Sequence, residues 1–255
     1  MSDTPRGREQ EVWARLDRVT DPELDEPVTS LGFVTSVAVD GARVHVGFRL
    51  PTYWCAANFA FLMADDMRRE ISALPWIRDV KVELGEHMYA ETINAGLDEG
   101  RSFRETFGAD AREDLVELRQ TFVRKSFQRR QEQVLQGLLG AGHAAATIMA
   151  MTVADLRTLP GDADLVALIG RYLQRRGQPG EFDEASVAFV DVAGQPIPAA
   201  ALGPYLRRLR SVTVNMEFNG ALCRGLLAAR FGEDQADDGS AELHHFMRQG
   251  ARELR

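Results

Sequence analysis

The strongest constraint on the fold is a two-residue turn, Asp40-Gly41, that lies between two stretches of alternating residues. In both stretches, apolar side chains recur at about every second position, which is the period of a half-buried β-strand. Asp-Gly between such stretches is a strong signal for a tight hairpin. The sequence therefore predicts two antiparallel strands, over Phe33–Val39 and Val44–Leu50.

Helical patterns flank this hairpin, and a third strand follows. Apolar residues three or four apart indicate a helix over Glu9–Val19, which ends before Asp21-Pro22 because proline disfavours a helical residue before it. The same spacing indicates a helix over Asn58–Leu74, and Ile77–Leu84 alternates as a strand. The first 85 residues thus read α-β-β-α-β, which predicts a small α+β sandwich over residues 1–86.

The remainder of the chain is expected to form two further segments. Residues 87–180 are predicted to be mainly helical, with a long charged helix over Asp110–Leu139. Residues 181–255 are predicted to be a small β-α-β-α unit with a frayed C-terminal tail. The elements expected there are strands over Ser186–Val192 and Ser211–Phe218 and helices over Pro198–Leu209 and Gly220–Phe231.

Composition and charge narrow the class of protein. Apolar residues make up 45% and charged residues 27% of the chain, and the net charge of −8 gives no general attraction to nucleic acid or anionic lipid. The first residues lack the apolar core of a signal peptide, and no apolar run reaches the ~18 residues that span a bilayer. We expect a cytoplasmic protein with neither nucleic acid nor membrane as a partner.

Two cysteines, Cys55 and Cys223, are too few for a disulfide framework. Cys55 lies at or just before the N-terminus of the second predicted helix, where backbone N–H groups and the helix dipole favour a thiolate. A thiolate attacks electrophiles or binds soft metals. Taken alone, these residues also fit a buried structural Cys55, a turn-forming Asp21 and a helix-capping Thr52. Cys223 is expected in the core.

A series of short motifs runs through Val12–Leu84. They are a leading helix, Asp21-Pro22-Glu23, Leu31-Gly32-Phe33-Val34, the hairpin, Thr52 three residues before Cys55, the second helix, and a strand entered through Leu74-Pro75. In this order they resemble the SufT/PaaD-like domain of iron–sulfur cluster assembly, a family that includes the MIP18-type proteins. The resemblance implies a small α/β domain whose acidic turn and cysteine meet at one edge.

The same resemblance implies that Asp21, Glu23, Thr52 and Cys55 line one pocket. Cys55 is then the thiolate ligand or sulfur-handling residue. Glu23 or Asp21 adds an oxygen ligand or holds a water, and Thr52 orients the turn or the thiolate. The implied cofactor is iron or an iron–sulfur cluster, bound stably or only transiently.

His87 follows the third predicted strand and is a further candidate metal ligand, beside Cys55 and Glu23, because segments after strands often carry function. The alternative is an exposed loop histidine. One cysteine supplies at most part of a cluster's four ligands. A bridged dimer or an external thiol would provide the others, and we expect a homo-oligomer.

Three functions remain open at this level. The leading hypothesis is an accessory maturation protein that helps install an iron–sulfur cluster or metal centre in a client metalloenzyme. The C-terminal extension resembles those found beside bacterial propane-type di-iron monooxygenases, which implies such an enzyme as the client. The alternatives are an interaction module with a structural Cys55, and a thiol enzyme with Cys55 as nucleophile, His87 as base and Asp21 or Glu23 as orienting group.

Overall fold

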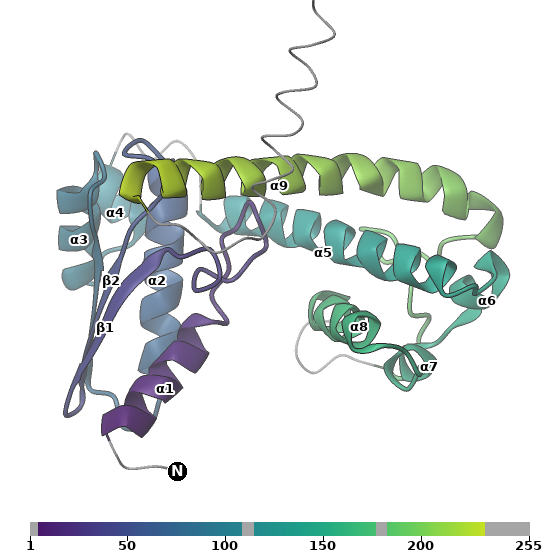
Figure 1. The fold of residues 1–255 in the computed structure, drawn as a ribbon, viewed down its shortest axis with the longest axis horizontal. Helices are drawn as coiled ribbons and strands as arrows, with labels where there is room; N and C mark the ends of the chain where they lie inside the picture. The colour runs from purple at the N-terminus through teal and green to yellow at the C-terminus, as the bar shows by residue number, and fades with distance from the viewer. Residues whose placement is uncertain (1–4, 109–114, 177–182, 233–255) are drawn as a thin grey trace, which may run out of the picture. The chain divides into compact units, whose positions relative to one another are not determined.

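The computed structural model describes residues 5–108, 115–176 and 183–232 of the chain (Figure 1). The chain divides into two compact units, each with a hydrophobic core of its own. The first comprises Met1–Leu118 together with Phe218–Arg255, and the second comprises Arg119–Glu217. The expected boundaries of the three sequence segments stay a prediction, and the expected C-terminal tail from residue 233 lies outside the described residues.

A three-stranded sheet forms the centre of the first unit. Its strands are β1 (Val34–Asp40), β2 (Arg43–Phe48) and β3 (Asp79–Leu84), in the order β1-β2-β3. The first two strands are antiparallel, and Gly41 supplies the positive φ of +62° that the hairpin turn requires. The strand β3 lies parallel to β2, so the chain needs a crossover between them. The predicted α-β-β-α-β order is confirmed.

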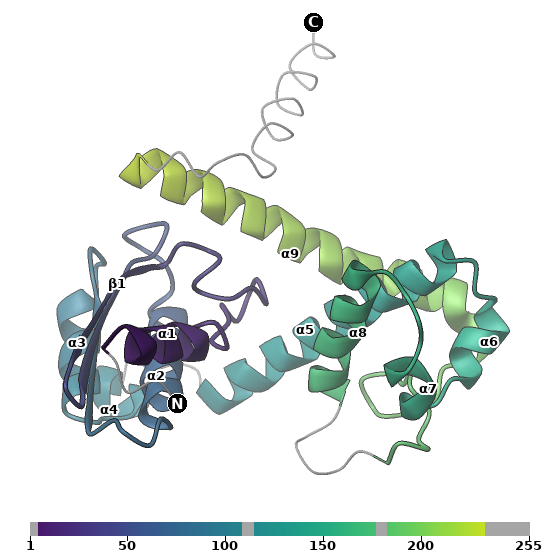
Figure 2. The same cartoon turned by 60° about the horizontal axis from the view of Figure 1, so that its bottom comes forward.

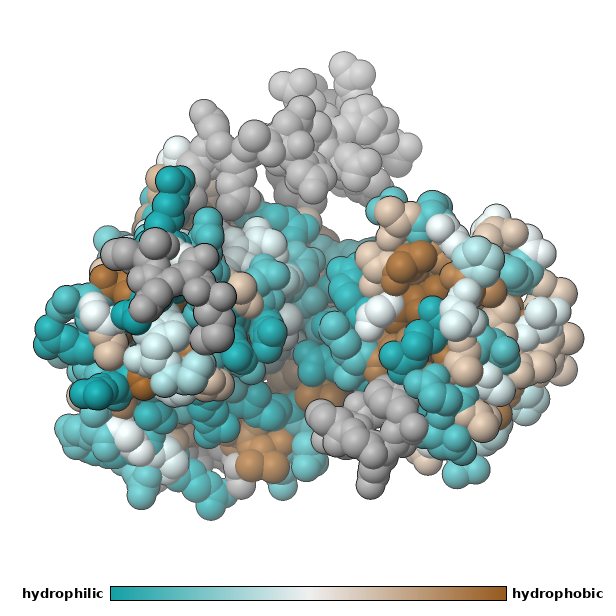
Figure 3. Space-filling model, turned by 90° about the horizontal axis from the view of Figure 1, so that it is seen from below, coloured by the Kyte–Doolittle hydropathy of each residue, from teal (hydrophilic) through white to brown (hydrophobic). Residues whose placement is uncertain are grey.

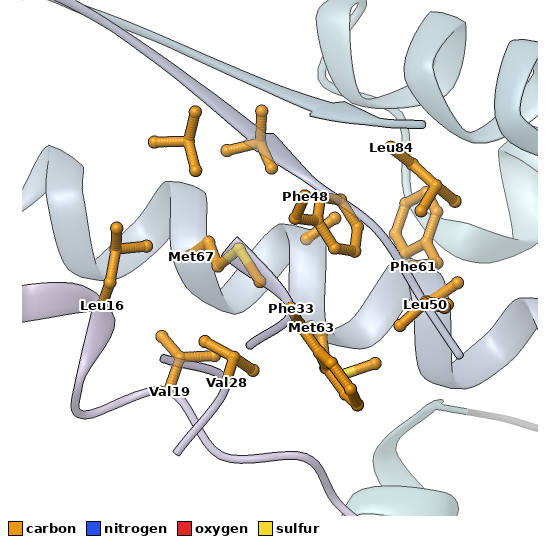
Figure 4. Close-up of a cluster of buried hydrophobic side chains, with 14 of the residues drawn as sticks. Leu16, Val19, Val28, Phe33, Phe48, Leu50, Phe61, Met63, Met67 and Leu84 are labelled. Carbon is orange, nitrogen blue, oxygen red and sulfur yellow. The ribbon is translucent and has the colours of Figure 1, made fainter. Parts of the chain in front are cut away.

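The crossover is the helix α2 (Ala57–Ser72), which packs on β3 and on the leading helix α1 (Pro5–Leu16) (Figures 1 and 2). Its apolar face joins a core with residues from β2, β3 and the loop after α1 (Figure 4). Phe33, Phe48 and Met67 are at most 2% exposed in this core. Each such side chain contributes about 1.5–3 kcal/mol of hydrophobic free energy. Two helices follow β3, namely α3 (Ala90–Asp98) and α4 (Phe103–Phe107).

The second unit is helical and has a separate core. Gln131 is buried in this core. Its amide N–H donates to the carbonyl oxygen of Val190 at 2.7 Å, and its amide oxygen accepts from the Tyr205 hydroxyl at 2.5 Å, so both ends of the side-chain amide are hydrogen-bonded. The core of the second unit is built from α5 (Leu115–Gly140), α6 (Ala145–Ala150), α7 (Val153–Arg157), α8 (Ala163–Arg176), the 3₁₀ turn η2 (Ala199–Ala201) and α9 (Leu202–Phe231).

The strand expected over Ser211–Phe218 is wrong, because these residues lie inside the single helix α9. The β-branched run Val212-Thr213-Val214 favours a strand locally. A second pattern prevails: Leu206, Leu209, Thr213 and Met216 recur every three or four residues and are all buried, as one face of a helix requires. The strand expected over Ser186–Val192 is also replaced, by isolated bridges from Thr152 to Val187 and from Val190 to Pro196.

The surface carries mostly hydrophilic residues on the face shown in Figure 3, with smaller apolar patches between them. Among the described residues, no helix has both the length and the apolar character needed to cross a membrane. The α+β fold class is confirmed, with the sheet confined to the first unit among the residues described.

Candidate functional site

Cys55 lies in the loop that joins β2 to α2. The helix begins after its N-cap residue Ala56, so Cys55 directly precedes the positive end of α2, as expected. Thr52 is not the helix cap. Its hydroxyl oxygen Oγ1 instead lies 3.0 Å from Cys55 Sγ, within hydrogen-bond distance. The Thr52–Cys55 spacing therefore brings a hydroxyl to a half-buried thiol.

Asp21 closes the acidic loop that follows α1. One carboxylate oxygen, Oδ1, accepts hydrogen bonds from the backbone N–H groups of Glu23 and Leu24, both at 2.8 Å. The loop is tightened by an N–H bond from Asp21 to the carbonyl of Glu26 at 2.9 Å. Burial raises the pKa of Asp21 to about 6, although both backbone bonds oppose this shift. Asp21 thus has the turn-forming role, and its role toward a ligand stays a prediction.

The last turns of α9 pack against this acidic loop within the first unit. The Asn219 amide donates to Glu23 Oε1 at 3.0 Å, and the Arg224 guanidinium pairs with Glu26 at 2.8 Å. The side chain of Leu227 is only 1% exposed in the core shared with the sheet. Sequence reasoning missed this packing. The helical spacing of residues 219, 223 and 227 is a visible signal for a buried face, but it does not reveal what covers that face.

The His87 side chain reaches the loop that carries Cys55, but its two ring nitrogens hydrogen-bond to backbone atoms and not to the thiol. Its Nδ1 accepts from the N–H of Tyr89 at 3.1 Å, so Nε2 carries the hydrogen and donates to the Cys55 carbonyl oxygen at 2.8 Å. Burial lowers the pKa of His87, and the positive charge of Arg230 adds to this shift. The alternative of an exposed histidine is wrong, because the side chain is only 5% exposed. His87 positions the cysteine backbone.

Cys223 packs against the core of the first unit as expected, but it is only partly buried. Burial raises the pKa of its thiol to about 12, and the charges of Asp21, Cys55 and Glu23 add to the shift. The hydrogen bonds of Asn219 to Glu23 and of Arg230 to the Leu50 carbonyl, on either side of Cys223 along α9, place this cysteine near the predicted site residues. Over the described ranges, no three His, Cys, Asp or Glu side chains are arranged to hold a metal ion, so Cys55, Glu23 and His87 do not form a ready-made metal site.

Large exposed apolar side chains lie next to Cys55 in its own loop and in the loop after β3. Tyr53 and Trp54 are 51% and 71% exposed, and Met88 and Tyr89 in the neighbouring loop are also exposed. The two loops are joined by a hydrogen bond from the N–H of Met88 to the carbonyl of Tyr53 at 2.9 Å. Exposed apolar groups gathered in this way are typical of surfaces that meet other macromolecules.

The fold and site define a class: a small α+β domain with an accessible cysteine at a helix N-terminus and a closed acidic loop at the same edge. Comparisons with known proteins then show which family this domain is similar to. Residues 9–84 match the family model described as iron–sulfur cluster assembly protein. Residues 9–84 of the first unit are therefore similar to an iron–sulfur cluster assembly domain.

A curated relative also matches part of the chain. The chloroplastic Fe–S cluster assembly factor HCF101 of Arabidopsis thaliana is 28% identical over 88 residues. That alignment includes 34% of this chain and 16% of the relative, so the chain matches a small part of that protein's length. The family match ends at residue 84, with the last residue of β3, so it does not extend to α3 or to any later element.

Proposed function

We propose that this protein is an accessory maturation factor that helps install an iron–sulfur cluster, or another iron centre, in a client metalloenzyme. The observation that carries the proposal is the Cys55 thiol, 3.0 Å from the Thr52 hydroxyl, inside the segment that matches the assembly family. Iron or the cluster is then the cargo that this thiol handles.

The residues around Cys55 have distinct parts in this function. The cysteine binds iron as a thiolate, and the Thr52 hydroxyl donates a hydrogen bond to the sulfur, which orients and stabilises the negative charge. His87 fixes the Cys55 backbone through its carbonyl oxygen. Glu23 is the proposed oxygen ligand or water-holding group on the acidic loop, whose shape Asp21 maintains.

An incomplete set of ligands suits a carrier. A cluster takes four protein ligands, and one chain offers few at this edge. The remaining ligands would come from a second copy of the chain, an external thiol or the client itself, so that the cargo is held transiently and passed on. We propose a cytoplasmic homo-oligomer, and a di-iron monooxygenase as client on the resemblance of the extension.

The thiol-enzyme alternative has less support. A general base for Cys55 needs a free ring nitrogen directed at the thiol. Both nitrogens of His87 are engaged by backbone groups, one at the Cys55 carbonyl and one at the Tyr89 N–H. These contacts support the proposal that His87 positions the cysteine loop and that Cys55 acts as a ligand rather than as a nucleophile.

The test is cluster loading and delivery by the anaerobically purified full chain. Wild type, Cys55→Ser and the surface control Asp98→Asn are reconstituted with iron and sulfide, analysed for both elements, and mixed with an apo-ferredoxin as acceptor. We expect Cys55→Ser to lose most of the bound iron and the delivery, while the control matches wild type. Equal loading and delivery by Cys55→Ser would refute the proposal.

A further inference from the structure

We propose that Cys223 is the second thiol of this site, and that Cys55 and Cys223 of one chain bind the same iron of the cargo. This inference rests on the proposed function and deepens it, because it adds a ligand from the far end of the chain. It also assigns a function to the last turns of α9, which lie outside the segment matched by the family.

The position of Cys223 is determined by its neighbours on one face of α9. Asn219, Cys223, Leu227 and Arg230 are spaced by four, four and three residues, so they share that face. Asn219 bonds Glu23 at 3.0 Å on the acidic loop. Leu227 is buried in the core of the sheet. The helix is therefore held against the domain on both sides of the cysteine.

Arg230 ties the same face to the loop that leads to Cys55. Its guanidinium donates to the carbonyl oxygen of Leu50 at 3.4 Å and to that of Glu86 at 3.0 Å. Leu50 directly precedes the loop of Thr52 and Cys55, and Glu86 directly precedes His87. Cys223 thus lies between contacts to the acidic loop and contacts to the thiol-bearing loop.

The charges near Cys223 agree with this placement. Its thiol interacts electrostatically with Asp21, Glu23 and Cys55, which are all acidic groups, and with the cation Arg224. A thiol among anionic neighbours is a poor place for a further negative charge but a good place for a soft cation, which binds thiolates and offsets their repulsion.

Two thiols are enough to capture iron but too few to enclose it. Both cysteines are free in the structure, and among the described residues no third His, Cys, Asp or Glu joins them in a metal-binding arrangement. Two such pairs from two chains, or one pair with two groups of an acceptor, would make the four ligands of a cluster. The pair therefore fits a carrier that must release its cargo.

Cadmium is the probe for the pair, because its binding to thiolates gives an ultraviolet absorbance independent of cluster chemistry. The reduced full chain is titrated with Cd²⁺ as wild type, Cys55→Ser, Cys223→Ser and Cys223→Ala, with Leu222→Ser as the matched control beside Cys223. We expect one tight Cd²⁺ per chain, with binding weakened on the order of a hundredfold by loss of either thiol, because the second thiolate binds intramolecularly. The control matches wild type.

Proximity is measured separately with a bifunctional reagent that becomes fluorescent only when both arms react with thiols. We expect an intrachain cross-link in wild type and none in the single-cysteine variants. Cys223→Ala keeps an apolar side chain at the helix face, and its thermal unfolding separates loss of the ligand from loss of packing. Wild-type Cd²⁺ affinity in folded Cys223→Ala, or the absence of an intrachain cross-link, would overturn the inference.

The two proposals fail in different ways. If Cys55→Ser abolishes cluster delivery while Cys223 substitutions leave Cd²⁺ affinity unchanged, the proposed function stands and the thiol pair is refuted. If both thiols are needed for Cd²⁺ but wild type neither loads nor delivers a cluster, the pair stands as a site for thiophilic metal and the proposed function is refuted.

Discussion

Asp21 holds the shape of the acidic loop at a cost in folding stability. Its carboxylate organises the acidic loop through two backbone hydrogen bonds, yet it is only 8% exposed and is costly to ionise there. Its pKa of about 6 lies above the ordinary value of 3.8. The folded state therefore binds the proton more tightly than the unfolded chain, so this group favours folding most at low pH.

The pH dependence follows from that sign. The contribution of Asp21 to the free energy of unfolding is constant below about pH 4, falls as the pH rises to about 6, and stays low above it. Asp21→Asn keeps an oxygen acceptor without the charge. We expect it to be more stable than wild type at pH 7.5 by up to about 3 kcal/mol and no more stable at pH 4. Urea unfolding at both pH values measures this, and exposed Asp98→Asn is the control. A loss of stability at pH 7.5 would contradict it.

Thr52 is predicted to act on the reactivity of Cys55 through its hydroxyl, which lies 3.0 Å from Sγ. A hydrogen bond to an ionised acceptor contributes about 1.5–3 kcal/mol. Thr52→Val removes it with little change of shape, so alkylation of Cys55 at neutral pH is expected to slow by roughly tenfold or more, whereas Thr52→Ser retains the rate. Peptide mass spectrometry after timed alkylation resolves Cys55 from Cys223. Equal rates in all three proteins would exclude this role.

At the scale of elements, the end of α9 is held to the acidic loop by charge as well as by apolar burial. The Arg224–Glu26 pair spans 2.8 Å, and its side chains are 37% and 26% exposed. Arg224→Glu places two like charges there, and we expect a loss of about 1 kcal/mol and faster hydrogen exchange over residues 219–231. The exchanged pair, Arg224→Glu with Glu26→Arg, should recover most of the protection. Unchanged exchange in the single variant would show that the ion pair does not hold the helix.

The elements themselves were predictable to different degrees. Periodicity and the Asp40-Gly41 turn are local, and they place the hairpin, α2 and β3 within a few residues of their observed bounds. The error over Ser211–Phe218 has a physical cause, since local β preference is weaker than the burial of one face of a long helix. Burial depends on partners elsewhere in the chain, which a local pattern does not specify.

At the scale of the whole molecule, the site joins residues that are close in sequence with residues that are far apart. Asp21, Glu23, Thr52 and Cys55 belong to the segment whose order of motifs resembles the iron–sulfur assembly family, and that resemblance nominated them. The contact between Asn219 and Glu23 joins positions 196 residues apart, and no spacing in the sequence encodes it. The structure is needed to bring Cys223 to the site.

The exposed apolar side chains beside Cys55, here called the apolar rim, are Tyr53, Trp54, Met88 and Tyr89. They lead to a prediction about cluster delivery rather than cluster loading. Trp54 is 71% exposed beside Cys55. Its removal in Trp54→Ala costs little burial, so the free energy of unfolding is expected to change by no more than about 0.5 kcal/mol. Iron bound per chain should also remain, because the indole is no ligand. An acceptor that contacts the rim loses an aromatic anchor, so the delivery rate should fall several-fold.

The measurement is the ratio of cluster delivered to cluster loaded, with exposed Val166→Ala in the second unit as the control. A fall in loading together with delivery would instead assign Trp54 to the structure of the thiol loop.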